Sequence, residues 1–187
     1  MIGEFIGEIN HNGGGSVMGY KIEKRVEISS WVITSILLLL FLPRKRLREA
    51  IPIFLFKQFM TWFFGLLVVQ TDKIKYPFRL FFKNATKSSF TFEYFVYPSL
   101  CALFNLYYPE KGNRKTKFLY YFAHTFILTF FEFFIEKYTK LITYKKWNWC
   151  WSFSSIWGTY YLSRVFHKWF FKVPAYNKEI YEQNITR

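Results

Sequence analysis

The chain is poor in the residues on which many enzymes and disulfide-bonded domains depend. Among its 187 residues there are only two cysteines, Cys101 and Cys150, and 12 acidic residues against 26 basic ones. Both cysteines lie in long apolar stretches, and no CxxC motif or His/Cys cluster is present, so neither a disulfide framework nor a structural zinc site is expected. The sequence also lacks an HExxH motif, a GxSxG motif and a glycine-rich phosphate loop. We therefore predict no catalytic residue, no cofactor and no metal.

Apolar and aromatic side chains are what the chain has in excess. They make up 52% and 25% of the residues, with 25 Phe, 14 Tyr and 7 Trp. The formal net charge is +14, and the basic residues are gathered between apolar runs. This pattern is typical of loops that flank membrane spans and meet anionic lipid headgroups, and it fits nucleic-acid binding less well. We expect a lipid bilayer, and no nucleic acid, as the partner.

Five stretches are long and apolar enough to cross a bilayer, which takes about 20 apolar residues in a helix. They cover about 26–42, 50–70, 90–108, 118–135 and 147–171. Helices satisfy their own backbone polar groups, as the bilayer interior requires, and these continuous runs do not alternate as barrel strands do. The sequence thus predicts an all-α fold, a polytopic transmembrane helical bundle of about five spanning helices over 26–171.

Both ends of the chain are polar. Residues 1–25 are predicted to be a flexible tail without a signal-peptide pattern, and 172–187 a polar C-terminal tail. Three glycines, 13–15, precede Met18, and consecutive glycine codons can resemble a ribosome-binding site. Residues 1–17 are therefore either a translated leader, with Met18 as the start, or a short flexible tail. Lysine and arginine are divided almost equally between the two sides, and the cluster RKRLR after the first span favours an N-terminus outside.

Polar side chains recur at helical spacing in four of the five spans. Steps of three and four residues place such side chains on one helix face, and polar groups in membrane helices usually face the bundle interior. Ser and Thr in such positions commonly bond to the preceding helical turn or join helices. The candidate intramembrane seam comprises Lys57, Gln58, Glu93, Asn105, His124, Glu132, Ser155 and Thr159.

Among these residues, Glu132 and Lys57 are the charges least easily explained by a position at the membrane–water boundary. A Lys57–Glu132 pair would neutralise both, and alternatively Glu132 carries protons or ions. Glu93 lies near the start of its span, so helix capping and a buried functional carboxylate both fit. Pro98 is expected to free the carbonyl of Tyr94 and to kink the helix.

Four segments carry a resemblance to a known family. They are FLPRKRLREA, FKQ in the second span, SFTFEYFVYPSLCALFNLYYPE and KKWNWCW. Over about 29–171 the chain resembles a function-unassigned family of small integral membrane proteins from endospore-forming Gram-positive bacteria. The resemblance implies a multi-helix bundle in the bacterial cytoplasmic membrane and transfers no site residue.

Three classes of function fit these observations. The first is a structural or accessory membrane component, acting with a membrane-protein partner or as a homo-oligomer. The second is a small proton- or ion-coupled permease or channel using Glu132. An intramembrane enzyme comes third, because no nucleophile and base can be named. A water-accessible cavity lined by Glu93, Asn105, Glu132 and Ser155 would favour the second class, and a dry seam the first.

Overall fold

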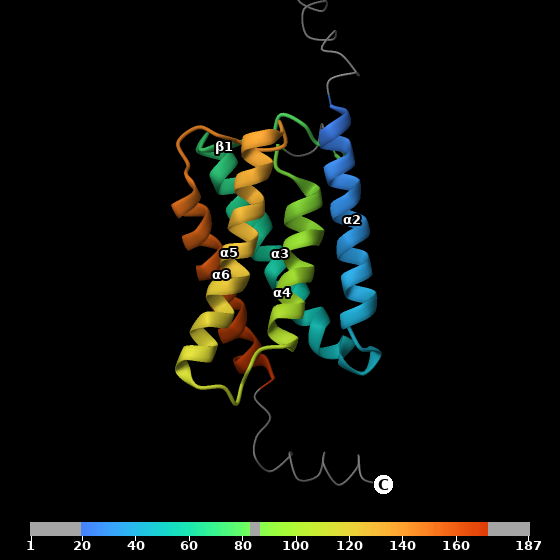
Figure 1. Cartoon of the computed structure of the whole chain (residues 1–187), viewed down its shortest axis with the longest axis vertical. Helices are drawn as coiled ribbons and strands as arrows, with labels where there is room; N and C mark the ends of the chain where they lie inside the picture. The colour runs from blue at the N-terminus through green and yellow to red at the C-terminus, as the bar shows by residue number, and fades with distance from the viewer. Residues whose placement is uncertain (1–19, 83–86, 172–187) are drawn as a thin grey trace, which may run out of the picture.

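The computed structural model describes residues 20–82 and 87–171, which form a bundle of helices running alongside one another (Figure 1). Five α-helices make up most of this part of the chain: α2 (Lys21–Phe41), α3 (Leu47–Gln70), α4 (Tyr97–Leu106), α5 (Arg114–Tyr138) and α6 (Trp149–Phe170). A 3-10 segment, η1 (Arg44–Arg46), precedes α3, and a π-helical segment, η2 (Thr91–Val96), runs directly into α4. The prediction of a helical bundle is confirmed for these residues.

The helices lie at the predicted spans, but their ends differ. The tail predicted over 1–25 is wrong for the residues from Lys21 onward, because these begin α2. Glu23 in this first turn accepts a hydrogen bond of 3.0 Å from the backbone N–H of Lys140, which ties the start of α2 to the segment after α5. Residues 1–19, with Met18, and the C-terminal tail 172–187 lie outside the described residues.

A small antiparallel ribbon closes one end of the bundle. Strand β1 (Ile74–Lys75) follows α3, strand β2 (Thr143–Tyr144) follows α5, and Ile74 pairs with Tyr144. Ile74 packs with Leu141 and Ile142 in a buried cluster at this end. The ribbon therefore joins two connections that are far apart in the sequence.

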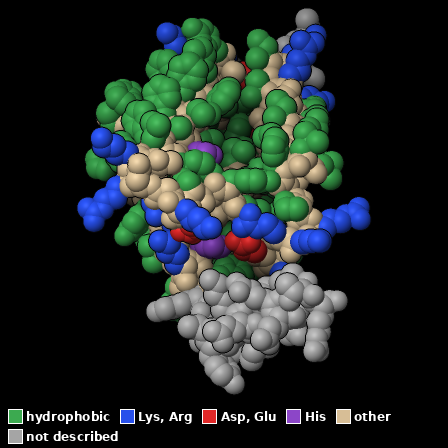
Figure 2. Space-filling model, turned by 60° about the horizontal axis from the view of Figure 1, so that its bottom comes forward, with side chains coloured by type: hydrophobic (Ala, Val, Ile, Leu, Met, Phe, Trp, Pro, Cys, Tyr) green, Lys and Arg blue, Asp and Glu red, His purple; other side chains and the backbone are tan. Residues whose placement is uncertain are grey.

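The flanks of the bundle are apolar. Figure 2 shows hydrophobic side chains over the sides and basic ones gathered toward the end that faces forward. Leu39 and Leu40 on α2 are 84% and 72% exposed, and phenylalanines form most of the exposed large hydrophobic side chains of α5. Within the described residues, two helical stretches, Arg44–Gln70 and Arg114–Tyr138, are long and apolar enough to cross a membrane, and only 11% of the apolar window of each is buried. A helix from the core of a soluble protein would instead be mostly buried.

The interior combines an aromatic core with buried charges. Phe104 and Tyr160, both fully buried, pack with Cys101, Tyr121 and Ile156 where α4, α5 and α6 meet. Charged side chains that are almost fully buried come from five helical elements: Glu23, Glu27, Lys57, Glu93, Glu132 and Arg164. The profile of an ordinary soluble domain, with apolar residues inside and charges outside, is thus partly reversed.

Candidate functional site

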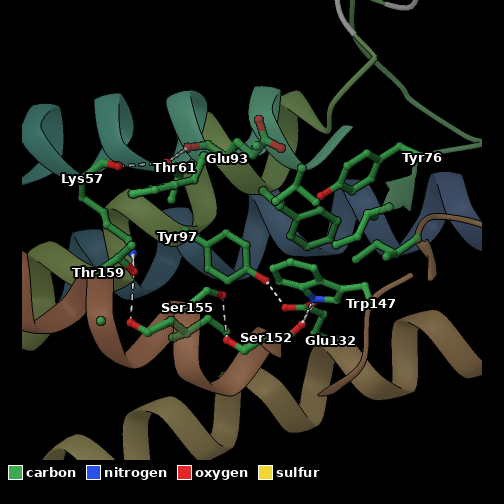
Figure 3. A pocket seen from close by; sticks show the side chains of 18 of the residues that line it. Lys57, Thr61, Tyr76, Glu93, Tyr97, Glu132, Trp147, Ser152, Ser155 and Thr159 are labelled. Carbon is green, nitrogen blue, oxygen red and sulfur yellow. Dashed lines mark hydrogen bonds between the residues drawn. The ribbon is translucent and has the colours of Figure 1, made fainter. Parts of the chain in front are cut away.

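A cavity of about 320 Å³ lies between α3, η2, α4, α5 and α6, next to the β1–β2 ribbon (Figure 3). Its aromatic lining comes from Phe64, Tyr76, Phe92, Tyr97 and Trp147. Its charged and hydroxyl-bearing lining consists of Lys57, Thr61, Glu93, Glu132, Ser152, Ser155 and Thr159.

Pro98 explains the irregular helix on one wall of this cavity. Because proline has no backbone N–H, the residues before it cannot complete the regular α-helical pattern. The N–H of Tyr97 donates to the carbonyl of Phe92, five residues back, as in a π-helix. The sequence predicted a free carbonyl at Tyr94. With hydrogen bonds that reach five residues back, the carbonyl that would need the missing N–H of Pro98 is instead that of Glu93. Thr61 on α3 supplies the replacement, and its hydroxyl donates to that carbonyl at 2.7 Å.

The Glu93 side chain lies against α3 at a glycine. A methyl group built on Gly65 would lie 2.6 Å from the carboxyl carbon of Glu93, so a larger residue there would force this flexible carboxylate to shift. Glu93 is 4% exposed, and among the described residues its carboxylate forms no ion pair and no hydrogen bond of good geometry. Its neighbouring donors are neutral, the side chain of Ser88 and the backbone of Ser89. A buried carboxylate without a charged partner is costly, and it is relieved by taking up a proton or a cation.

Glu132, on α5, has the opposite environment. Its carboxylate accepts hydrogen bonds from Tyr97 at 3.1 Å, Tyr144 at 2.6 Å and Ser152 at 2.7 Å. Trp147 donates in turn to the hydroxyl of Ser152 at 2.8 Å. Burial, reinforced by the Glu132 carboxylate, raises the pKa of Tyr144, which keeps this phenol protonated as a donor. Glu132 thus joins α5 to α4, to β2 and to α6.

Lys57 is a buried cation on the same face of α3 as Thr61 and Gly65. It is 2% exposed, its ammonium donates to the hydroxyl of Thr159 at 2.5 Å, and it lies 4.9 Å from the centre of the Tyr160 ring. Among the described residues it forms no ion pair with Glu132, so the predicted Lys57–Glu132 pair is wrong. The two side chains have separate partners, Thr159 for Lys57 and three hydroxyls for Glu132.

The structure brings five of the eight seam residues to the cavity: Lys57, Glu93, Glu132, Ser155 and Thr159. Ser155 and Thr159 also donate to backbone carbonyls of the preceding turn, at 2.9 and 3.0 Å. The other three, Gln58, Asn105 and His124, do not line the cavity.

Asn105, His124 and Gln58 do not line the cavity. Asn105 donates to the carbonyl of Cys101 and to the hydroxyl of Ser163, both at 2.9 Å, and so links α4 to α6. His124 donates through Nδ1 to the carbonyl of Tyr120 at 2.9 Å and packs against Phe104. Both are structural interactions within the bundle.

Several residues of the site were missed in the sequence. Tyr76, Tyr144 and Trp147 come from connections between helices, and only the ribbon brings them to the cavity. Outside the cavity, the buried Glu23 and Glu27 of α2 were also missed: Glu23 precedes the predicted span 26–42, and Glu27, at its start, was not singled out. Their four-residue spacing, continued by Trp31, was the available signal of a polar face on α2.

A second polar cluster lies at the end opposite the ribbon. Arg46 donates to Glu49 through Nε at 2.8 Å and Nη2 at 2.9 Å, and to the carbonyl of Leu106 at 2.6 Å. His167 contacts Glu49 at 2.8 Å and Arg164 at 2.9 Å. Because each charge here has a partner, this cluster fastens α3 to α4 and α6.

No known protein supplies a function for this arrangement. Comparison of the chain with protein families, curated proteins and solved structures finds no match. Within residues 20–82 and 87–171, no group of three or more His, Cys, Asp and Glu side chains is placed to hold a metal ion.

The contact between Gly65 and Glu93 gives a test of the site geometry. We expect Gly65→Ala to be less stable than Gly158→Ala by about 1 kcal/mol, because the Glu93 carboxylate must shift to make room for the added methyl. Gly158→Ala is the matched control: a methyl there meets nothing within 4 Å, so alanine should be neutral or stabilising by up to about 1 kcal/mol. Thermal unfolding in detergent measures both.

A double-mutant cycle identifies the cause. In a Glu93→Ala background the cost of Gly65→Ala should shrink, because the clashing group has been removed. An undiminished cost, or a Gly65→Ala protein as stable as Gly158→Ala, would contradict the assigned packing.

Proposed function

We propose that this chain is an integral membrane protein with five helical passes, four of which line a chamber whose carboxylate takes up a proton or a cationic group. The passes are α2, α3, η2 with α4, α5 and α6. This proposal is supported by the distribution of side chains: the flanks of the bundle are apolar, its ends are basic, and several charges are buried inside it. The resemblance noted in the sequence suggests the bacterial cytoplasmic membrane as its location.

The third pass fits a bilayer although it is short and irregular. Seven of the ten residues of α4, from Pro98 to Leu106, are buried, and η2 contributes four more. Non-helical or distorted backbone at membrane depth is tolerated only where protein covers it. Here α2, α3 and α6 all contact the third pass, so its distorted turn is shielded from lipid.

The observation that carries the function is the unpaired, buried carboxylate of Glu93 in the cavity. A structural or accessory protein has no need to keep such a group, since replacing it with an apolar residue removes its burial cost. A permease or channel needs a carboxylate that exchanges protons or cations. We therefore favour the permease or channel class, with Glu93 in the role that the sequence suggested for Glu132.

Five passes require the two ends of the chain to lie on opposite sides of the membrane. Figure 1 agrees with this arrangement, because α2 starts at the ribbon end and α6 finishes at the other. We expect protease-cleavable tags at the two termini to be cut from opposite sides of sealed vesicles, the N-terminal tag from outside. If both tags are cut from the same side, the number of passes is even and the proposal fails.

The role of Glu93 is tested by flux into liposomes. We expect purified protein to admit protons or monovalent cations above the level of protein-free vesicles, and Glu93→Gln to reduce this flux at least tenfold. Glu132→Gln serves as the comparison: it should lower the unfolding temperature, because it disturbs three hydrogen bonds, and keep most of the flux. Absence of flux in the native protein, or loss of flux only in Glu132→Gln, would refute the assignment.

A further inference from the structure

We infer that the ligand of this chamber is a small zwitterion, whose ammonium group binds at Glu93 and whose carboxylate binds at Lys57. This inference rests on the proposed chamber and specifies what occupies it. It is carried by two buried charges of opposite sign that line one cavity and are not paired with each other.

Lys57 has unused capacity to bind an anion. An ammonium group offers three donors, and among the described residues its hydrogen-bond partner is the hydroxyl of Thr159. That hydroxyl is neutral, and the ring of Tyr160 is the other feature that attracts the charge. No carboxylate of the described residues lies within ion-pairing distance of Lys57, so its charge calls for an anionic group.

The two charges are placed at different points along the cavity. Gly65, which marks the position of the Glu93 carboxylate, lies eight residues after Lys57 on α3, or about 12 Å along the helix axis. A molecule that satisfies both groups therefore carries its own charges apart, as an amino acid with several methylene groups between amine and carboxylate does.

The cavity matches such a molecule in size and lining. About 320 Å³ is near the lower limit of small-ligand sites, which run from roughly 300 to 1,000 Å³. The lining also includes Phe64, Tyr97 and Ile156, which suit a methylene chain. Aromatic faces also attract an ammonium group.

Ligands with one charge fit less well. A simple cation would leave Lys57 as a like charge in the same chamber, and a simple anion would face Glu93. Glu132 does not compete for the ammonium group, because three hydroxyl groups already donate to its carboxylate.

Binding of straight-chain amino acids to the full-length protein in lipid nanodiscs tests the inference. The probes are glycine, 4-aminobutanoate and 5-aminopentanoate, with n-butylamine and butanoate as the singly charged counterparts. We expect the 4- or 5-carbon amino acid to bind at least tenfold more tightly than n-butylamine, and butanoate to bind most weakly, by calorimetry. This comparison uses the native protein, so it does not depend on the folding of any variant.

Two substitutions then assign the ends of the ligand. Lys57→Met should abolish the preference for the amino acid, weakening its binding and strengthening that of n-butylamine because a like charge is removed, whereas Glu93→Gln should weaken both at least tenfold. Lys137→Met, at an exposed lysine of α5, is the control and should change neither. Thr159→Val, which removes the partner of Lys57 and keeps its charge, should retain the preference for the zwitterion.

The outcomes separate this inference from the proposed function. Equal binding of n-butylamine and the amino acid, unaffected by Lys57→Met, overturns the zwitterion and leaves a cation chamber at Glu93. Absence of binding by every probe, with flux that still depends on Glu93, also overturns it. Absence of both binding and flux removes the chamber and the inference together.

Discussion

The arrangement of the bundle depends on a missing hydrogen-bond donor. Pro98 cannot donate to the helix before it, so the backbone adopts the π-helical pattern and leaves the carbonyl of Glu93 for Thr61. Thr61 and Gly65 are one turn apart on α3, and they hold the carbonyl and make room for the carboxylate of the same residue. In the proposed bilayer setting, an irregular helix of this kind must be surrounded by others, and its central place in the fold agrees with this.

The acidic residues inside the bundle differ in what surrounds them. Glu132 accepts three hydroxyl hydrogen bonds, and Glu27 accepts from Thr91 at 3.0 Å and from the backbone of Leu80 at 3.2 Å. These carboxylates fasten loops and helices together. Glu93 accepts no hydrogen bond of good geometry among the described residues and lies only beside the neutral donors of Ser88 and Ser89, and Lys57 likewise has only neutral partners. The unpaired charges share a cavity, and this is the physical basis for assigning it a ligand.

The helices were predictable from the sequence because long apolar runs and their basic boundaries are local properties. The shared face of Lys57, Thr61 and Gly65 followed from helical spacing in the same way. The partners of these residues were not predictable, because they depend on how helices rotate against one another and on a two-residue ribbon too short to show a pattern. Glu132 seemed the functional acid because its neighbours in sequence are apolar, and its hydroxyl partners come from three other elements.

The central claim is that Glu93 is the carboxylate free to react, and carbodiimide labelling tests it most directly. A lipid-soluble carbodiimide modifies carboxyl groups in apolar surroundings, and peptide mass spectrometry of the membrane-embedded protein locates the adduct. The account predicts modification of Glu93, with Glu132 and Glu27 protected by their hydrogen bonds. Modification of Glu132 in preference to Glu93 would contradict the account.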